Sequence, residues 1–260
     1  MNDRIALLDD VARLARHAGS EILAAAREPL VVQHKADGSP VSAADRRAEA
    51  VILAGLARLT PSWPVIAEEA FGRGEVPAAG TRCWLVDALD GTREFVAGSG
   101  EYTVNIALVE SGAPTLGVVL APALDRCWLG LQGQGAWVEA GQQARRLIHA
   151  RKVPAQGPVA TLSRRHGEAA RTEAWLAREG VRARVLAGSS LKFGLIAAGE
   201  ADVYPRFGRT MEWDTAAGHA VLAAAGGSVC DLDGRALRYG KPGHENPEFV
   251  ARGVGGAEGG

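Results

Sequence analysis

Residues 84–105 read WLVDALDGTREFVAGSGEYTVN, and the rest of the chain is organised around them. The apolar residues before Asp87 have the length and composition of a buried strand, which we expect to stop at Asp87. A second carboxylate follows at Asp90. Two bare carboxylates at the end of a buried strand would repel each other, whereas a divalent cation such as Mg²⁺ binds carboxylate oxygens and removes the repulsion.

The residues after Asp90 predict a second part of the same site. Gly91 and Thr92 can form a tight turn that opens a short helix, and the backbone N–H groups at a helix start favour an anion. A cation on one side and amide donors on the other predict a phosphate site. Asp-x-x-Asp-Gly is also a common turn sequence, in which aspartate caps and glycine adopts a positive φ. The two aspartates alone leave both interpretations open.

The composition narrows the class of protein. A length of 260 residues allows one large domain or two closely packed ones, and a formal net charge of −1 gives no nucleic-acid footprint. We find no apolar run of the roughly 18 residues that a membrane span needs, and no pattern typical of a signal peptide. Three widely spaced cysteines favour a reducing compartment over disulfides or a zinc site. We therefore expect a cytoplasmic protein, and a peripheral association with the inner membrane stays compatible with the sequence.

The residues before the central stretch predict two helices and a strand. Apolar residues at helical spacing predict an amphipathic helix over residues 4–27. Ser42, with Asp45 three residues later, predicts the capped start of a second helix, so that Asp45 needs no other role than capping. Residues 64–67 predict a short strand that leads to Glu68, and a carboxylate there is also typical of a solvated strand end.

The residues after the central stretch predict a sheet and then a change of domain. Alternating apolar residues up to position 138 continue the sheet, and Gly133-x-Gly135 predicts a hairpin because the third glycine of a dinucleotide-binding motif is missing. Polar residues 141–157 predict the boundary between an N-terminal half, residues 1–150, and a C-terminal half, residues 151–252. The last residues, 253–260, read GVGGAEGG and predict a disordered tail.

The C-terminal half carries two further candidate segments. A strand that ends at Gly188, followed by Ser189, Ser190 and a helix, predicts hydroxyl and N–H groups at a helix start, where one serine is expected to be an ordinary cap. Lys192 follows in a chain with only four lysines, which favours a contact with substrate. Asp214 is expected in the first turn of another helix, where an acid also stabilises the helix dipole without any further role.

Three separated motifs resemble those of the inositol monophosphatase superfamily of Mg²⁺-dependent, lithium-sensitive phosphatases. They are Glu68-Glu69, Asp87–Thr92 and Trp213–Gly218, in the family's order. The family's Asp-Pro-Leu-Asp-Gly-Thr signature has one departure here, because Ala88 stands where proline is usual. The resemblance covers about residues 30–250 and implies an α/β fold, a five-layer α/β/α/β/α sandwich.

The resemblance also implies a set of site residues. It implies two or three Mg²⁺ ions, held by Glu68, Asp87, Asp90, Asp214 and the carbonyl of Leu89. It implies a catalytic set of Asp45, Thr92 and Glu68, in which Asp45 polarises Thr92 and Thr92 takes a proton from the attacking water. The residues that it places against the substrate are Glu68, Leu89, Asp90, Gly91, Thr92, Ser190, Lys192, Arg206 and Asp214.

Within the superfamily, the segments Gly100–Asn105, Ser189–Phe193 and Tyr204–Gly208 are most similar to the 3′(2′),5′-bisphosphate nucleotidases. This similarity implies hydrolysis of adenosine 3′,5′-bisphosphate, a by-product of sulfate assimilation, to AMP and phosphate. Lys192 and Arg206 would then meet the second phosphate, and the adenine would pack on Tyr204 or Phe207 unless those rings belong to the core.

Other functions and assemblies stay open at this point. The same metal site could serve inositol monophosphate, histidinol phosphate or fructose 1,6-bisphosphate, and a non-catalytic phosphate-binding protein could share the scaffold. The chain could be a monomer or a homodimer.

Overall fold

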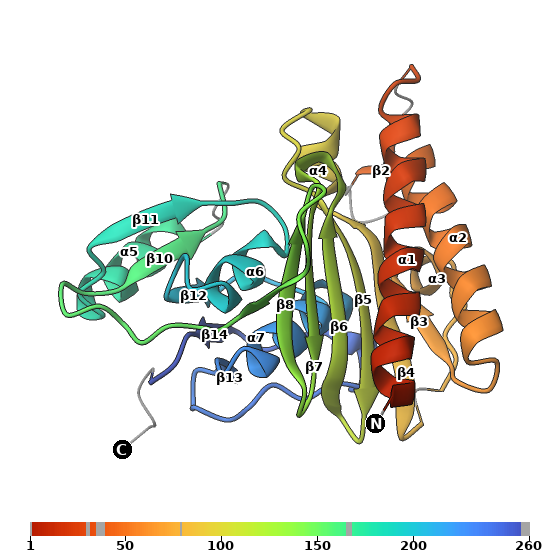
Figure 1. Ribbon diagram of the computed structural model, residues 1–260. Coiled ribbons are helices and arrows are strands. Elements are labelled where there is room, and N and C mark those ends of the chain that lie inside the picture. The colour runs from red at the N-terminus through yellow and green to blue at the C-terminus, as the bar shows by residue number, and fades with distance from the viewer. Residues whose placement is uncertain (1, 30–31, 35–39, 79, 165–167, 256–260) are drawn as a thin grey trace.

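The computed structural model describes residues 2–29, 32–34, 40–78, 80–164 and 168–255, and the expected features within residues 35–39 lie outside them. Two large sheets organise the described chain: a seven-stranded sheet of order β3-β4-β5-β6-β7-β8-β9 and a five-stranded sheet of order β11-β10-β12-β14-β13. Helices α1 and α2 cover one face of the larger sheet, α6 and α7 lie between the sheets, and α5 lies against the smaller sheet (Figure 1). The layers follow the order α/β/α/β/α, so the predicted fold class is confirmed.

The outer helical layer follows from the apolar periodicity of the N-terminus. The predicted helix over residues 4–27 is confirmed as α1 (Asn2–Ala25), and α2 spans Ala43–Leu59. The stripe on α1 is fully excluded from solvent and comprises Leu8, Val11, Ala15, Ala18 and Ile22. It packs against alternate residues of the larger sheet, which fits strands whose successive side chains point to opposite faces. A two-stranded ribbon, β1 (Val32–His34) with β2 (Pro40–Ser42), precedes α2.

The larger sheet begins with β3 (Val65–Ala67), which runs parallel to β4 (Arg82–Asp90). Antiparallel neighbours then follow in chain order: β5 (Thr103–Glu110), β6 (Ala113–Ala121), β7 (Arg126–Leu131), β8 (Gly135–Ala140) and β9 (Arg146–Ile148). A single 3₁₀ turn, η1 (Pro122–Leu124), connects β6 to β7. The predicted hairpin at the two glycines joins β7 to β8 and is confirmed.

Strand β4 differs from the prediction, because it continues through Asp87 to Asp90. Asp87 lies opposite Asn105 and Asp90 lies opposite Thr103, so three steps on β4 match two on β5. This one-residue bulge has a direct consequence for the site. Residues three apart in a regular strand face opposite sides, but Thr103 and Asn105 face the same side, and their partners therefore do so as well.

The middle layer consists of α6 (Leu191–Ala197) and α7 (Glu212–Ala224), and α7 is buried almost throughout. Glycines on the sheet let α7 approach closely. A Cβ on Gly117 would lie 2.4 Å from the carbonyl oxygen of Ala217, which no real side chain tolerates. A helix from the C-terminal half thus packs directly on the sheet of the N-terminal half, and both halves share one hydrophobic cluster.

The smaller sheet contains β10 (Val159–Leu162), β11 (Ala183–Leu186), β12 (Val203–Arg206), β13 (Ser228–Asp231) and β14 (Phe249–Arg252). Helix α5 (Ala169–Arg178) packs on its outer face through Trp175 and Leu176. The predicted disordered tail is wrong for its first residues: the N–H of Gly253 donates to the Asp202 carbonyl at 2.9 Å and that of Val254 to the Arg151 carbonyl at 3.0 Å. Residues 256–260 of that prediction lie outside the described chain.

Two further findings concern the class of protein. Among the described helices, none combines the length and apolar character that a membrane span requires. The three cysteines are free thiols. Burial raises the pKa of the Cys83 thiol to about 11, so this side chain behaves as an unreactive core residue.

Candidate active site

The start of α2 brings together Asp45 and Thr92, as predicted. The backbone N–H and the hydroxyl of Ser42 both donate to Asp45 Oδ2 at 2.7 Å, which forms the capping box. The other oxygen, Oδ1, accepts a hydrogen bond from Thr92 Oγ1 at 3.0 Å. Asp45 is buried, and each of its two oxygens has its own partner: Oδ2 binds Ser42 and Oδ1 binds Thr92. The capping interpretation is confirmed, and it leaves one oxygen for Thr92.

Gly91 turns the chain from β4 into the short helix α4 (Thr92–Val96). Its φ of 89° lies in the left-handed region that favours glycine, and a Cβ there would lie 3.3 Å from the Ser189 side chain. The turn places Thr92 Oγ1 3.3 Å from the Leu89 carbonyl oxygen, while the Leu89 N–H donates to Asp87 Oδ1 at 3.0 Å. Leu89 therefore links Thr92 to Asp87, because its carbonyl contacts one and its N–H contacts the other.

Three carboxylates converge at this point. Oxygen atoms of Glu68, Asp87 and Asp214 lie within 4.8 Å of one another. Glu68 begins α3 (Glu68–Gly72) directly after β3, and the parallel pairing of β3 with β4 puts it beside Asp87. Asp214 arrives from the first turn of α7, more than a hundred residues later in the chain. The three are predicted metal ligands, and the structure brings them together.

The electrostatics of this carboxylate cluster favour a bound cation. Burial raises the pKa of Asp87 well above its usual range, and the neighbouring charges of Glu68, Asp90 and Asp214 raise it further. Burial also raises the pKa of Asp214, with Asp90 and Glu68 as the next causes. Oxygen-only donors, closely spaced and partly excluded from water, are the ligand set that Mg²⁺ prefers. The residues present therefore fit a divalent magnesium site.

Asp90 lies at the edge of the cluster and is held by four donors. Its Oδ2 accepts from Ser189 Oγ at 2.6 Å, Ser190 Oγ at 3.0 Å, Asn105 Nδ2 at 3.3 Å and Thr103 Oγ1 at 3.5 Å. Ser190 is buried and its Oγ also lies 2.7 Å from the Asp214 carbonyl oxygen. In the structure Ser190 makes its contacts within the site, and its predicted contact with substrate stays a prediction. Sequence reasoning gave Asn105 no role, although it lies two positions from Thr103 on the same face.

Lys192 contacts backbone carbonyls of its own turn, and its predicted contact with substrate stays a prediction. Its side chain is only 3% exposed, and Nζ donates to the carbonyl oxygens of Ala187 and Ser189 at 3.2 and 2.5 Å. Burial lowers its pKa to about 8. Ser189 has a φ of 51°, and this tight turn leaves carbonyl groups that need a donor. In the structure Lys192 supports the serine turn.

Two connected cavities open beside the cluster. One, of about 200 Å³, is lined by Asp90, Gly91, Asp214 and three arginines. The other, of about 420 Å³, shares Arg93, Ser163 and Arg206 with it. Cations therefore lie where the two cavities meet.

The three arginines differ in their partners. Arg164 is paired with Glu101, and Arg206 donates to the carbonyls of Gly208 and Arg209. Arg93 is exposed, and its guanidinium makes no hydrogen bond or ion pair to any residue that the structure describes. Sequence reasoning missed Arg93, although it directly follows the Gly91-Thr92 turn.

The two rings that were candidates for adenine contact are buried. Tyr204 is 5% exposed and packs edge-on against Phe193 and Phe249 in the core between the sheets. Phe207 is 8% exposed and packs against Trp175 of α5, although it also lines the larger cavity. Tyr204 therefore belongs to the core, but it also lines the smaller cavity, and contact of either ring with adenine stays a prediction.

Comparisons with known proteins agree with this arrangement. The model of the inositol monophosphatase family matches residues 7–254. The 3′(2′),5′-bisphosphate nucleotidase CysQ of Escherichia coli (strain K12) is 47% identical over 235 residues, which are 90% of this chain and 94% of that protein. The protein of the same name from Buchnera aphidicola is 39% identical over 90% of this chain and 87% of its own length. The crystal structure of CysQ from Bacteroides thetaiotaomicron superposes with a TM-score of 0.80 at 34% identity, covering 95% of this chain and 97% of that one.

Proposed function

The chain belongs to the inositol monophosphatase family and is a phosphatase, and on that premise we propose that it is a Mg²⁺-dependent 3′(2′),5′-bisphosphate nucleotidase. Its reaction is the hydrolysis of adenosine 3′,5′-bisphosphate to AMP and phosphate. The observation that carries the proposal is the hydrogen bond between Thr92 and Asp45 beside the carboxylate cluster. Asp45 can accept a proton through Thr92, and Leu89 links Thr92 to Asp87 of the carboxylate cluster.

The cation site would hold two or three Mg²⁺ ions. Their ligands would be Glu68, Asp87, Asp90, Asp214 and the carbonyl oxygen of Leu89. When bound, the ions neutralise charge on the phosphoryl oxygens and make a water molecule more acidic. Ala88, in the place of the family's usual proline, removes none of these ligands.

Thr92 and Asp45 would handle the proton of the attacking water. Thr92 Oγ1 donates its own hydrogen to Asp45 Oδ1, which leaves the lone pairs of Oγ1 available to accept a proton. Ser42 holds the opposite oxygen of Asp45 with two hydrogen bonds, so the carboxylate cannot easily rotate away. A positioned acceptor of this kind is what general-base catalysis requires.

The reacting phosphate would lie against the first turn of α4. The N–H groups at a helix start have no partner within the helix, and Gly91, which precedes this start, lines the smaller cavity. Such donors stabilise the charge that develops on the phosphoryl oxygens.

We assign the second phosphate to Arg93 and Arg206, at the junction of the two cavities. An arginine can donate two parallel hydrogen bonds to a phosphate. The nucleoside would extend into the larger cavity beyond them, and Lys192 would act by holding the serine turn. A phosphomonoester of inositol or histidinol has no second phosphate and would leave these cations unused.

A panel of phosphate esters tests the assignment. With Mg²⁺ present, we expect faster phosphate release from adenosine 3′,5′-bisphosphate than from inositol 1-phosphate, histidinol phosphate or fructose 1,6-bisphosphate, and AMP as the product. Inhibition by millimolar LiCl at limiting Mg²⁺ is also expected. A preference for the inositol ester would contradict the nucleotidase assignment and leave the family unaffected. No release from any ester would favour a binding protein.

Arg93→Ala tests the second-phosphate site. A charge-assisted contact contributes about 1.5–3 kcal/mol, so kcat/KM for the bisphosphate should fall at least tenfold and that for inositol 1-phosphate much less. Arg164→Ala is the matched control, because this arginine lines the same cavity but is already paired with Glu101. Equal losses on both substrates would remove Arg93 from the specificity site.

A further inference from the structure

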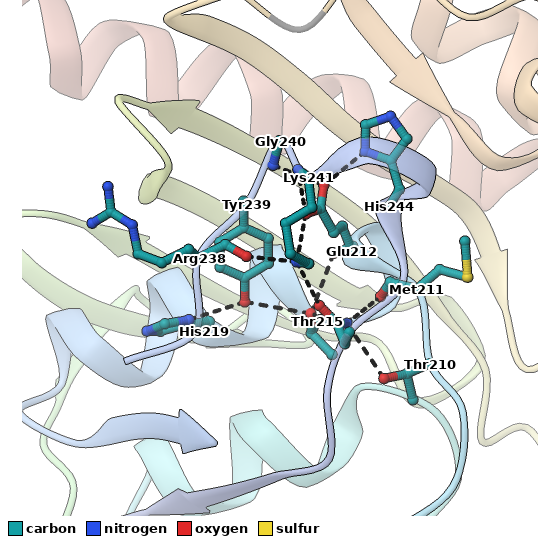
Figure 2. Close-up of polar contacts among 11 residues, drawn as sticks. Thr210, Met211, Glu212, Thr215, His219, Arg238, Tyr239, Gly240, Lys241 and His244 are labelled. Carbon is teal, nitrogen blue, oxygen red and sulfur yellow. Dashed lines mark hydrogen bonds and ion pairs between the residues drawn. The ribbon is translucent and has the colours of Figure 1, made fainter. Parts of the chain in front are cut away.

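A fully buried carboxylate lies two residues before the metal ligand Asp214. Glu212 is the first residue of α7 and is 0% exposed. It is bound by residues 238–246, which we call the strap and which contain the 3₁₀ turn η2 (Pro242–His244). Figure 2 shows the strap crossing over the start of α7 with its polar groups directed at Glu212 and Thr215.

Four hydrogen bonds hold Glu212 in the strap. Oε2 accepts from the Gly240 N–H and from His244 Nδ1, both at 2.8 Å. Oε1 accepts from the N–H and the Nζ of Lys241, at 3.0 and 2.5 Å. Both carboxylate oxygens therefore have two donors each, and all four come from the strap.

A second group of contacts holds the same helix turn from the other end of the strap. Asn246 Nδ2 donates to the Met211 carbonyl at 2.7 Å and lies 3.0 Å from Thr215 Oγ1. The Tyr239 hydroxyl also lies 3.3 Å from Thr215 Oγ1 (Figure 2). The strap thus binds residues on both sides of Asp214, while Asp214 itself accepts from the Met211 N–H at 2.8 Å.

The strap also reaches the helix that carries Glu68. The ring of Phe71, on α3, lies 5.1 Å from that of Trp213 and 5.7 Å from that of His244, between ring centres. Helices α3 and α7 supply ligands from opposite halves of the chain, and the strap contacts both.

We infer that Glu212, clamped by the strap, is a positioning residue for the metal centre. The clamp fixes Glu212 and the residues on both sides of Asp214, and in this way it holds the Asp214 carboxylate beside Glu68 and Asp87. This inference rests on the proposed function, since it requires the cluster to bind Mg²⁺.

Calorimetric titration of the metal-free protein with Mg²⁺ tests the inference without measuring activity. Glu212→Gln keeps the size of the side chain but removes the charge that Lys241 and His244 bind. Changes to groups that orient metal ligands typically weaken metal binding 10–100-fold, and we expect a rise of that size in the Kd of this variant.

Asp202→Asn is the matched control. Asp202 is also buried and accepts from Arg151 at 2.8 and 2.9 Å and from the Val159 N–H at 2.7 Å, all at the smaller sheet. We expect this variant to lose stability but to bind Mg²⁺ as the wild type does. Equal weakening of metal binding in both variants would mean a general loss of stability, and would overturn the inference.

Lys241→Met provides a second, milder variant if Glu212→Gln does not fold, because it removes only the Nζ donor. Its Kd should rise in the same direction, by less. A folded Glu212→Gln or Lys241→Met protein whose Kd stays within twofold of the wild type would overturn the inference alone. If the wild type itself binds no Mg²⁺, the proposed function fails and the inference fails with it.

Discussion

Asp45 and Asp214 hold the same position in two different helices. Each is the third residue of its helix, and each accepts a hydrogen bond at Oδ2 from the N–H of the residue that precedes the helix. The distances are 2.7 Å from Ser42 and 2.8 Å from Met211. Beyond the cap the surroundings differ: Asp45 meets the hydroxyl of Thr92, and Asp214 meets two other carboxylates.

The difference shows how one local motif supports two chemical roles. The hydroxyl donor fits Asp45 to the proton relay that we propose. Burial raises the pKa of Asp214 and the neighbouring carboxylates raise it further, so that a bound cation would favour its charged form. The role of each aspartate therefore depends on which side chains the fold brings to its free oxygen.

Removal of the metal should have the largest effect, and it should act through Asp214 and its neighbours. In excess chelator we expect no phosphate release, with full recovery on addition of Mg²⁺. Ca²⁺ should restore activity poorly, because it is too large for octahedral Mg²⁺ geometry. Activity that persists in excess chelator would show that Asp214 does not act through a bound cation, and the proposed difference between Asp45 and Asp214 would fail.

Asp45→Asn should come next, with kcat lower by on the order of 10²–10⁴-fold, the usual loss when general-base help is removed. The Kd for Mg²⁺, measured by calorimetry, should not change. Asparagine keeps one oxygen for the Ser42 N–H but removes the negative charge from the helix start, which should lower the free energy of unfolding by about 0.3–1 kcal/mol. A variant that keeps its kcat and only unfolds at a lower temperature would show that Asp45 is a cap and no more.

Asp214→Asn should show the reverse pattern. Changes to residues that only hold a metal ligand in place typically weaken metal binding roughly 10–100-fold. Because Asp214 is itself a proposed ligand, we expect its change to weaken Mg²⁺ binding by at least as much. The asparagine oxygen can still accept from the Met211 N–H, and one repelling charge is gone, so the metal-free protein should become more stable. Urea denaturation in chelator would measure this, and a loss of stability equal to that of Asp45→Asn would contradict it.

The pH dependence of stability should give the smallest effect. The folded, metal-free protein holds protons on Asp87 and Asp214 above the ordinary aspartate pKa of 3.8, where the unfolded chain has released them. The free energy of unfolding should therefore fall as pH rises from that value to the raised pKa, by up to about 1.4 kcal/mol per pH unit for each group. Saturating Mg²⁺ should abolish the slope in urea denaturation, and a slope that persists would assign it to other groups.

The capped start of α2 and the positions of most helices and strands could be predicted because their signals are local. Ser42 and Asp45 lie three residues apart and form their box within one helical turn. The bulge between Asp87 and Asp90 could not be predicted, because it exists only as a mismatch with β5. The same holds for Asn105, whose amide meets Asp90 through that pairing.

Residue type alone was a poor guide to the cations. The rarity of lysine drew attention to Lys192, but the left-handed Ser189 turn leaves carbonyls that take its ammonium. Arg93 is one of many arginines in the sequence, and its position beside both cavities distinguishes it only in the structure. The clamp on Glu212 joins residues nearly thirty positions apart, and no short-range sequence pattern predicts it.

The sequence alone was sufficient for most helices and strands and for the cap at Ser42, because hydrophobic period and capping act over a few neighbouring residues. The choice of carboxylates as candidate ligands came from the resemblance to a family, and the cap expected from a serine after Gly188 is wrong, because Ser190 makes no side-chain cap hydrogen bond. The folded structure was needed to establish the shared face of Asp87 and Asp90, the partners of Lys192 and the clamp on Glu212. These features depend on contacts between residues far apart in sequence, where burial and neighbouring charge set the chemistry of a side chain.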